Sequence, residues 1–185
     1  LPLGALDEYR DPTGTIALAE VALGRPWLGK RAVALEEGAG ARLAFITRYG
    51  EPLLPGRTYL ADPASHMTLA QGYLIRLIPR DPADLYHPSC DRLLSSVAVV
   101  GGPLAIGVIL TGMGRDGARG MTAIAAAGGV TLAQDEASSV VFGMNREGIL
   151  AGCVQKVLPL DAIAGELTRL VGRVRQPPVT GAAGG

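Results

Sequence analysis

The sequence predicts an α/β fold: an open, mostly parallel sheet with flanking helices, in three Rossmann-like layers. From residue 90 onward, short apolar runs typical of buried strands alternate strictly with segments of helical period. Glycines punctuate this pattern, because Gly128-Gly129 and Gly152 stand where two of the helices should end. Strands separated by helices are joined by crossovers, and such strands pair in parallel.

Each element follows from its local pattern. The segment 15–23 has helical period, and strands are expected at 43–47, 58–61 and 73–78, within a small hairpin region at about 43–80. The second half predicts a helix at 90–97, a strand at 105–110, a helix at 118–127, a strand at 129–133, a helix near 143–151, a strand at 154–158 and a helix at 160–173.

Composition indicates one globular domain. The chain has 185 residues, of which 48% are hydrophobic and 18% charged, enough for one packed core. We expect this domain at 1–172 and a flexible tail at 173–185, where prolines and glycines replace apolar periodicity.

Charge and cysteine usage exclude several classes of function. Seventeen basic residues balance seventeen acidic ones, so the chain has no excess of positive charge that would indicate binding of nucleic acid. No apolar run reaches the roughly 20 residues of a membrane span. Cys90 and Cys153 lack metal-ligand spacing and predict neither a metal site nor a disulfide. We therefore expect a cytoplasmic protein, with no membrane insertion, whose partner is another protein.

A glycine-rich turn after the expected strand at 105–110 is the main candidate site. Gly112, Gly114 and Gly117 match the dinucleotide fingerprint G-x-G-x-x-G, and Asp135 follows at roughly the required distance. Asp116 argues against this alternative, because a carboxylate inside the loop would repel a pyrophosphate. We expect no cofactor here.

Three longer blocks resemble the C-terminal catalytic domain of bacterial chemotaxis protein-glutamate methylesterases, the CheB family. They are Thr-Gly-Met-Gly-Arg-Asp-Gly at 111–117, Leu-Ala-Gln-Asp-Glu-Ala-Ser-Ser-Val-Val-Phe-Gly-Met at 132–144 and Val-Leu-Pro-Leu-Asp at 157–161. The likeness extends upstream through 50–61, 65–69 and 87–94, the last resembling that family's His-Arg-Pro-Ser-Val-Asp segment with one residue missing. It is nearly continuous from about residue 42 to 171.

The resemblance implies a Ser-His-Asp hydrolase that removes methyl esters from receptor glutamates and, in some members, deamidates receptor glutamines. Asp116 matches the family's aspartate, which would orient the histidine and stabilise its imidazolium. Met113 matches a position whose backbone N–H would stabilise the oxyanion. The implied partner is a methylated chemoreceptor or another signalling protein.

The sequence departs from the family pattern within residues 1–41, which look degenerate or shortened. The family's Gly-Ala-Ser-Thr-Gly-Gly and Gln-His-Met-Pro turns are absent, and the best remnant puts Pro12 where the nucleophilic serine should be. Thr13 lies beside that position, but no histidine is predicted near it. His66, in an expected surface hairpin, and His87 match other family positions, so neither is expected to be the triad base.

Two structural roles compete with the catalytic ones. Ser89 is expected to cap the helix at 90–97 rather than act as a nucleophile. Asp116 could serve as a turn residue and N-cap of the helix at 118–127. Two functions thus remain open: a methylesterase-type hydrolase, and a degenerate, non-catalytic relative that acts as a signalling binding or scaffold module. The shortened N-terminal region also indicates that one strand of the family's sheet is missing, and a partner could cover the sheet end that this leaves.

Overall fold

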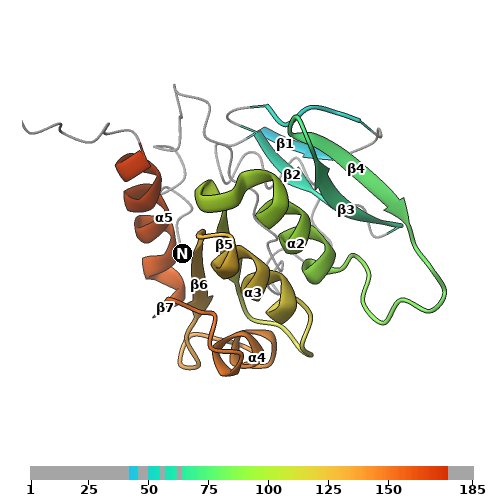
Figure 1. The fold of residues 1–185 in the computed structure, drawn as a ribbon. Helices are drawn as coiled ribbons and strands as arrows, with labels where there is room; N and C mark the ends of the chain where they lie inside the picture. Colours follow the sequence, from blue (N-terminus) through green and yellow to red (C-terminus); the bar gives the residue numbers. More distant parts are fainter. Residues whose placement is uncertain (1–41, 46–49, 55–56, 62–63, 175–185) are drawn as a thin grey trace, which may run out of the picture.

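Within the part of the chain that the structure describes, a three-stranded parallel sheet forms the centre of the fold. The computed structural model describes residues 42–45, 50–54, 57–61 and 64–174 (Figure 1). The sheet has the order β5 (Ile106–Ile109), β6 (Val130–Gln134) and β7 (Lys156–Leu158). Both strand pairs are parallel. The predicted α/β fold with a parallel sheet is confirmed.

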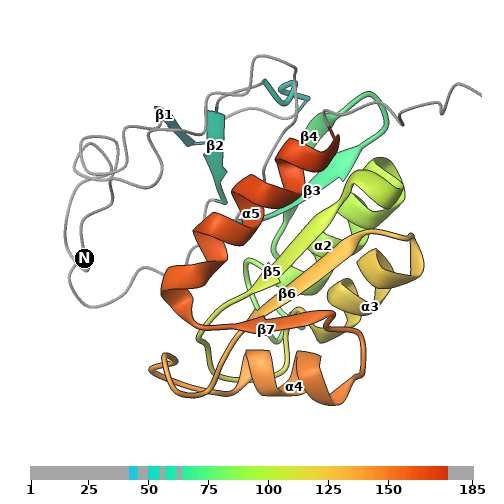
Figure 2. The same ribbon diagram turned by 90° about the vertical axis from the view of Figure 1, so that its left-hand side faces the viewer.

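Helices cover both faces of this sheet. Helix α5 (Leu160–Val174) crosses one face, and α2 (Cys90–Gly101) and α3 (Ala118–Ala126) cover the other, which gives the expected three layers (Figures 1 and 2). Helix α4 (Met144–Leu150) packs next to α3 and contacts β6 and β5. Within the described residues, no helix combines the length and apolar character needed to cross a membrane.

The region at 43–80 is only partly the expected set of hairpins. Strands β3 (Ser65–Ala70) and β4 (Leu74–Pro79) form an antiparallel hairpin. Strands β1 (Arg42–Phe45) and β2 (Arg57–Leu60), however, pair in parallel. The 11 residues between β1 and β2 exceed the two to five residues typical of a hairpin loop and are long enough for the chain to return in the same direction.

Most element bounds agree with the sequence to within one or two residues. The largest difference is α2, which continues to Gly101 and ends where Gly102 adopts a φ of 51°. Strand β3 lies in the expected hairpin region, where the sequence pattern predicts no separate bounds for it. The helix expected at 15–23 lies outside the described residues.

His66 lies in the core, although its hairpin was expected at the surface. Its exposed fraction is 0%, because β3 packs against α2 instead of facing solvent on both sides. A hydrogen bond of 2.8 Å from the Leu69 N–H to the Ser96 hydroxyl joins the same two elements. Burial of β3 brings a histidine next to the beginning of α2.

A compact apolar cluster lies beneath the carboxyl end of the sheet. Ile109, Met121, Ala133 and Cys153 are buried there, and Met144 packs against them. Helices α2 and α3 approach each other closely above the sheet, since a Cβ on Gly120 would lie 2.5 Å from the Leu94 Cβ. This packing fixes the relative positions of α2, α3 and the turn after β5.

Candidate functional site

The turn at 111–117 leaves the carboxyl end of β5, where open α/β sheets place their sites. It depends on glycine at two positions. Gly114 has a φ of 105°, and a Cβ there would lie 2.9 Å from the Tyr86 hydroxyl. Gly117 has a φ of 94°, and a Cβ there would lie 3.0 Å from the Ile109 Cδ1. Larger residues would force this turn away from the sheet.

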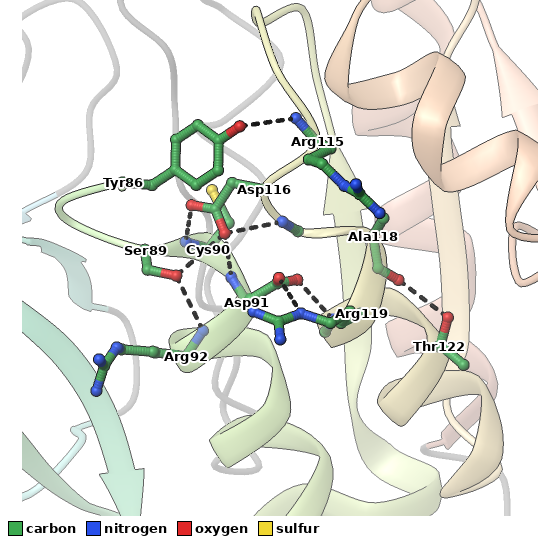
Figure 3. A network of polar contacts seen from close by, with 12 residues as sticks. Tyr86, Ser89, Cys90, Asp91, Arg92, Arg115, Asp116, Ala118, Arg119 and Thr122 are labelled. Carbon is green, nitrogen blue, oxygen red and sulfur yellow. Dashed lines mark hydrogen bonds and ion pairs between the residues drawn. The ribbon is translucent and has the colours of Figure 1, made fainter. Parts of the chain in front are cut away.

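Asp116 is buried within the turn and accepts four hydrogen bonds (Figure 3). Its Oδ1 accepts from the Ser89 hydroxyl at 3.0 Å, from the Asp91 N–H at 2.9 Å and from the Gly117 N–H at 3.1 Å. Its Oδ2 accepts from the Cys90 N–H at 2.7 Å. Three of these four donors belong to the N-terminal end of α2, where the helix dipole favours an anion.

Asp116 therefore caps a different helix from the one that the sequence predicted. We expected the side chain to cap the helix that follows it, but the N-cap residue of α3 is Gly117 and makes no side-chain capping bond. Asp116 instead satisfies donors of α2, some 25 residues earlier in the chain. The packing of α2 on α3 brings that helix terminus to the turn, and local sequence contains no sign of it.

Ser89 caps α2, as predicted. It adopts extended backbone angles, and its hydroxyl accepts from the Arg92 N–H while donating to Asp116. A nucleophilic hydroxyl has to give its proton to a base, whereas this one is held by a carboxylate that already accepts three other hydrogen bonds. The geometry assigns Ser89 a structural role.

Both ring nitrogens of His66 are engaged. Its Nδ1 accepts from the Ser89 N–H at 3.1 Å, so the ring proton lies on Nε2, which donates to the Asp84 carboxylate at 2.7 Å. Arg92 donates to the other oxygen of Asp84. The hydrogen bonds from His66, from the Asp81 N–H and from Arg92 hold the pKa of Asp84 well below its ordinary value. His66 thus accepts a hydrogen bond from the backbone N–H of Ser89 and is not bonded to the Ser89 hydroxyl as a general base would be.

The direction of the Met113 N–H follows from the hydrogen bonds of the preceding carbonyl. The Gly112 carbonyl accepts from the N–H groups of Gly143 and Met144, at 3.1 and 2.9 Å. A trans peptide is planar with its C=O and N–H pointing in opposite directions, so the Met113 N–H points away from α4. Among the described residues it has no hydrogen-bond partner. Met113 as a whole residue is 85% exposed.

A cavity of about 400 Å³ opens beside this turn. Apolar side chains of β5, of α2 and of the segment just before α2 form most of its wall, and Asp116, Thr111 and His87 also line it. The Nδ1 atom of His87 is buried and has no hydrogen-bond partner among the described residues. Volume and lining match those of small-molecule and side-chain binding sites. The cavity brings Asp116 and His87 to one space, but not His66.

The other predicted site residues lie apart or outside the description. Asp135 accepts two hydrogen bonds from Ser138 and is held within its own loop, which lowers the pKa of its carboxyl. Pro12 and Thr13 lie outside the described residues. Within the described ranges, no three side chains gather as a metal site would require. Cys90 and Cys153 are buried and form no disulfide with each other.

Sequence reasoning missed two buried polar residues that build the site. Asp91 accepts from the Gly120 N–H at 2.9 Å and from the Arg119 side chain, and so ties α2 to α3 (Figure 3). Gln134, at the end of β6, accepts from the Thr111 N–H at 2.9 Å. The available signal was a polar side chain where an otherwise apolar strand ends or a helix begins.

Comparison with known proteins agrees with this architecture. A profile of the CheB methylesterase family matches residues 41–167. The chain is 51% identical over 123 residues to "Protein-glutamate methylesterase/protein-glutamine glutaminase 3" of Paramagnetospirillum magneticum, covering 66% of this chain and 35% of that protein. It is 48% identical over 119 residues to "Protein-glutamate methylesterase FrzG" of Myxococcus xanthus, covering 64% and 36%. The chain thus spans about a third of the length of these relatives.

A solved structure supports the same assignment. The Thermotoga maritima CheB methylesterase catalytic domain superposes with a TM-score of 0.72 at 28% sequence identity, covering 91% of this chain and 92% of that one. The family profile spans well over half of the chain and includes the turn that carries Asp116. The chain therefore belongs to the CheB methylesterase family.

Proposed function

We propose that this domain supplies the acidic residue and the anion-binding turn of a protein-glutamate methylesterase in chemotaxis signalling. The reaction is hydrolysis of a glutamate γ-methyl ester, which releases methanol and leaves a carboxylate; hydrolysis of a glutamine side chain would release ammonia. The names of both relatives support the first reaction, and the name of the Paramagnetospirillum relative supports the second as well. The substrate would be a methylated chemoreceptor, or another signalling protein with such esters.

The observation that carries the proposal is the geometry of Asp116. In a Ser-His-Asp hydrolase, the histidine accepts the serine proton while its other N–H donates to the aspartate. Oδ2 of Asp116 accepts one hydrogen bond, and a carboxylate oxygen offers about two acceptor positions. One position therefore remains for a histidine N–H. Because Asp116 also lines the cavity, a donor can reach it from that side.

The Met113 N–H would supply the second group of the site, a donor that stabilises the negative charge formed during the reaction. During attack on an ester, negative charge develops on the carbonyl oxygen, and a fixed donor stabilises this charge. The Gly112 carbonyl holds the orientation of the Met113 N–H through two hydrogen bonds, so little reorganisation is needed. The donor lies on the same turn as Asp116, as the proposed chemistry requires.

A second candidate is a non-catalytic binding module. It is favoured by the engagement of both ring nitrogens of His66 and by the hydrogen bond from the Ser89 hydroxyl to Asp116. Neither side chain is arranged as a base or a nucleophile. Of the two histidines, His87 alone has a buried ring nitrogen with no partner among the described residues.

Methanol release from methyl-esterified chemoreceptor fragments separates these two functions. We expect wild-type protein to release methanol and Asp116→Asn to lose on the order of 10⁴-fold in rate, as for the aspartate of the protease triad. Asp91→Asn is the matched control, because Asp91 is equally buried and caps a neighbouring helix, yet it does not line the cavity. It should keep its rate at a temperature where it is folded.

Each outcome decides between the candidates. Equal losses in both variants would show that Asp116 acts only through folding. Background release by folded wild-type protein, together with saturable binding of the same receptor fragment, would reject the hydrolase and establish the binding module. If methanol is released, His87→Gln tests the base: loss of the rate would assign this role to His87, and an unchanged rate would place the base elsewhere.

A further inference from the structure

Gln134 is a buried polar residue that the proposed chemistry leaves without a role. It is the last residue of β6, and its exposed fraction is 1%. Burying a neutral amide is costly unless it is hydrogen-bonded. The partners of this side chain therefore indicate what it contributes to the site.

The amide of Gln134 bridges the two loops that leave β5 and β6. Its Oε1 accepts from the Thr111 N–H at 2.9 Å. Its Nε2 donates to the carbonyl and the hydroxyl oxygens of Ser138, at 2.8 and 3.2 Å. A flipped amide would place a donor against the Thr111 N–H and an acceptor against the Ser138 carbonyl, so the observed orientation is the one that satisfies both loops.

Further contacts join the same two loops next to this bridge. The Thr111 hydroxyl donates to the Val141 carbonyl at 3.1 Å and accepts from the Val141 N–H at 2.8 Å. The Gly112 N–H donates to the same carbonyl at 3.1 Å. The backbone of Gln134 is itself held, because its carbonyl accepts from the Asn145 side chain at 3.1 Å. Gln134 thus offers Thr111 a fixed acceptor.

These contacts determine where the Met113 N–H points. Gln134 fixes the peptide N–H of Thr111, and the carbonyl of the following residue, Gly112, is fixed by the beginning of α4. With the chain held on both sides, the peptide unit between Gly112 and Met113 has little freedom to rotate. Small displacements of a fixed donor are enough to reduce its stabilisation of a developing anion.

We infer that Gln134 is a positioning residue for the anion-binding turn, acting through Thr111 on the direction of the Met113 N–H. The catalytic consequence rests on the proposed hydrolase function, whereas the positioning does not. Gln134 would contact neither substrate nor reacting atoms. Its removal should lower the rate of the chemical step and leave substrate binding nearly unchanged.

The test uses Gln134→Leu, which removes all three side-chain hydrogen bonds at similar volume. Gln134→Glu is the graded variant, since it keeps an acceptor for Thr111 and loses the donors to Ser138. The matched control is Gln155→Leu, because Gln155 also donates to a backbone carbonyl, that of Gly129, but is exposed. Two readouts are needed: amide hydrogen exchange resolved by residue, and methanol release with kcat and KM determined separately.

We expect amide exchange at Thr111 to accelerate at least about fivefold in Gln134→Leu, the factor that one lost hydrogen bond implies. Exchange at Gly112, whose N–H donates to the Val141 carbonyl, should also accelerate because the turn is held less firmly. Exchange at Ile163 of α5 should be unchanged, which separates this local effect from global destabilisation. Gln134→Glu should retain protection at Thr111. For the reaction, kcat should fall about 10- to 100-fold with KM within about twofold of wild type.

The outcomes distinguish the inference from the proposed function. Unchanged exchange at Thr111 and Gly112 in Gln134→Leu would overturn the positioning role, whatever the activity. Equal acceleration at Thr111 and Ile163 would also overturn it, because Gln134 would then contribute only to overall stability. Local acceleration in a protein that releases no methanol would support the positioning role and reject the hydrolase. A raised KM at constant kcat would contradict positioning of the reacting donor.

Discussion

Replacing Asp116 with alanine should destabilise the protein far more than an ordinary loop substitution. The change removes the acceptor of the Cys90, Asp91 and Gly117 N–H groups, and all three residues are buried. The Ser89 hydroxyl also loses its acceptor, although it can rotate toward another. The first turn of α2 would then begin without a partner for two of its backbone donors.

The magnitude follows from these orphaned donors. Each buried N–H left without an acceptor costs about 1–3 kcal/mol, and loss of a helix-capping group costs about 1 kcal/mol. Because neighbouring contributions are not additive, we take the lower part of this range and expect a loss of about 3–5 kcal/mol. A domain of this size has a free energy of unfolding of about 5–15 kcal/mol, so the variant should be close to its stability limit.

Urea denaturation followed by circular dichroism measures this loss. Asp135→Ala is the control, because Asp135 accepts two hydrogen bonds from Ser138 in a partly exposed loop, and it should cost about 1 kcal/mol. If the free energy of unfolding depends on urea concentration with the same slope in variant and wild type, the difference lies in stability and not in the compactness of the unfolded state. A loss below about 1 kcal/mol for Asp116→Ala would refute the assignment of these donors to Asp116.

Two further predictions concern acid stability and the turn. The hydrogen bonds from Arg169 and then Lys156 lower the pKa of Glu166 from 4.5 to about 2. A depressed pKa means that this carboxylate stabilises the fold above its unfolded pKa and loses that contribution as the pH falls from 4.5 toward 2. Thermal melts between pH 5 and pH 2 should therefore show a shallower fall for Glu166→Gln than for wild type; a steeper fall would contradict the pairing. Gly114→Ala should cost about 1–3 kcal/mol in urea denaturation, because of its positive φ and the contact of its Cβ with Tyr86. A neutral result would contradict the positive φ of Gly114, because a movement of Tyr86 would relieve only the contact.

The alternation of apolar runs and helical segments from residue 90 onward was sufficient to predict the parallel sheet and its layers. Period and turn glycines are local properties, and a regular alternation of strands with helical crossovers is typical of parallel pairing. The same local reasoning did not predict the parallel pairing of β1 and β2, because a strand pattern does not show in which direction two strands run relative to each other. It also failed for His66, because the alternation of a half-buried strand does not show which helix covers it.

The identity of the turn and its aspartate could be read from the chain, because Thr-Gly-Met-Gly-Arg-Asp-Gly combines strand end, backbone-permissive glycines and a carboxylate within seven residues. The hydrogen-bond donors that contact this carboxylate could not be predicted from the sequence. Asp116 meets Cys90 and Asp91 only because α2 packs on α3, and Gln134 meets Thr111 only because β5 and β6 are neighbours in the sheet. Local sequence encodes elements and turn chemistry; contacts between residues more than 20 positions apart arise from packing, and at this site they determine which groups remain available for chemistry.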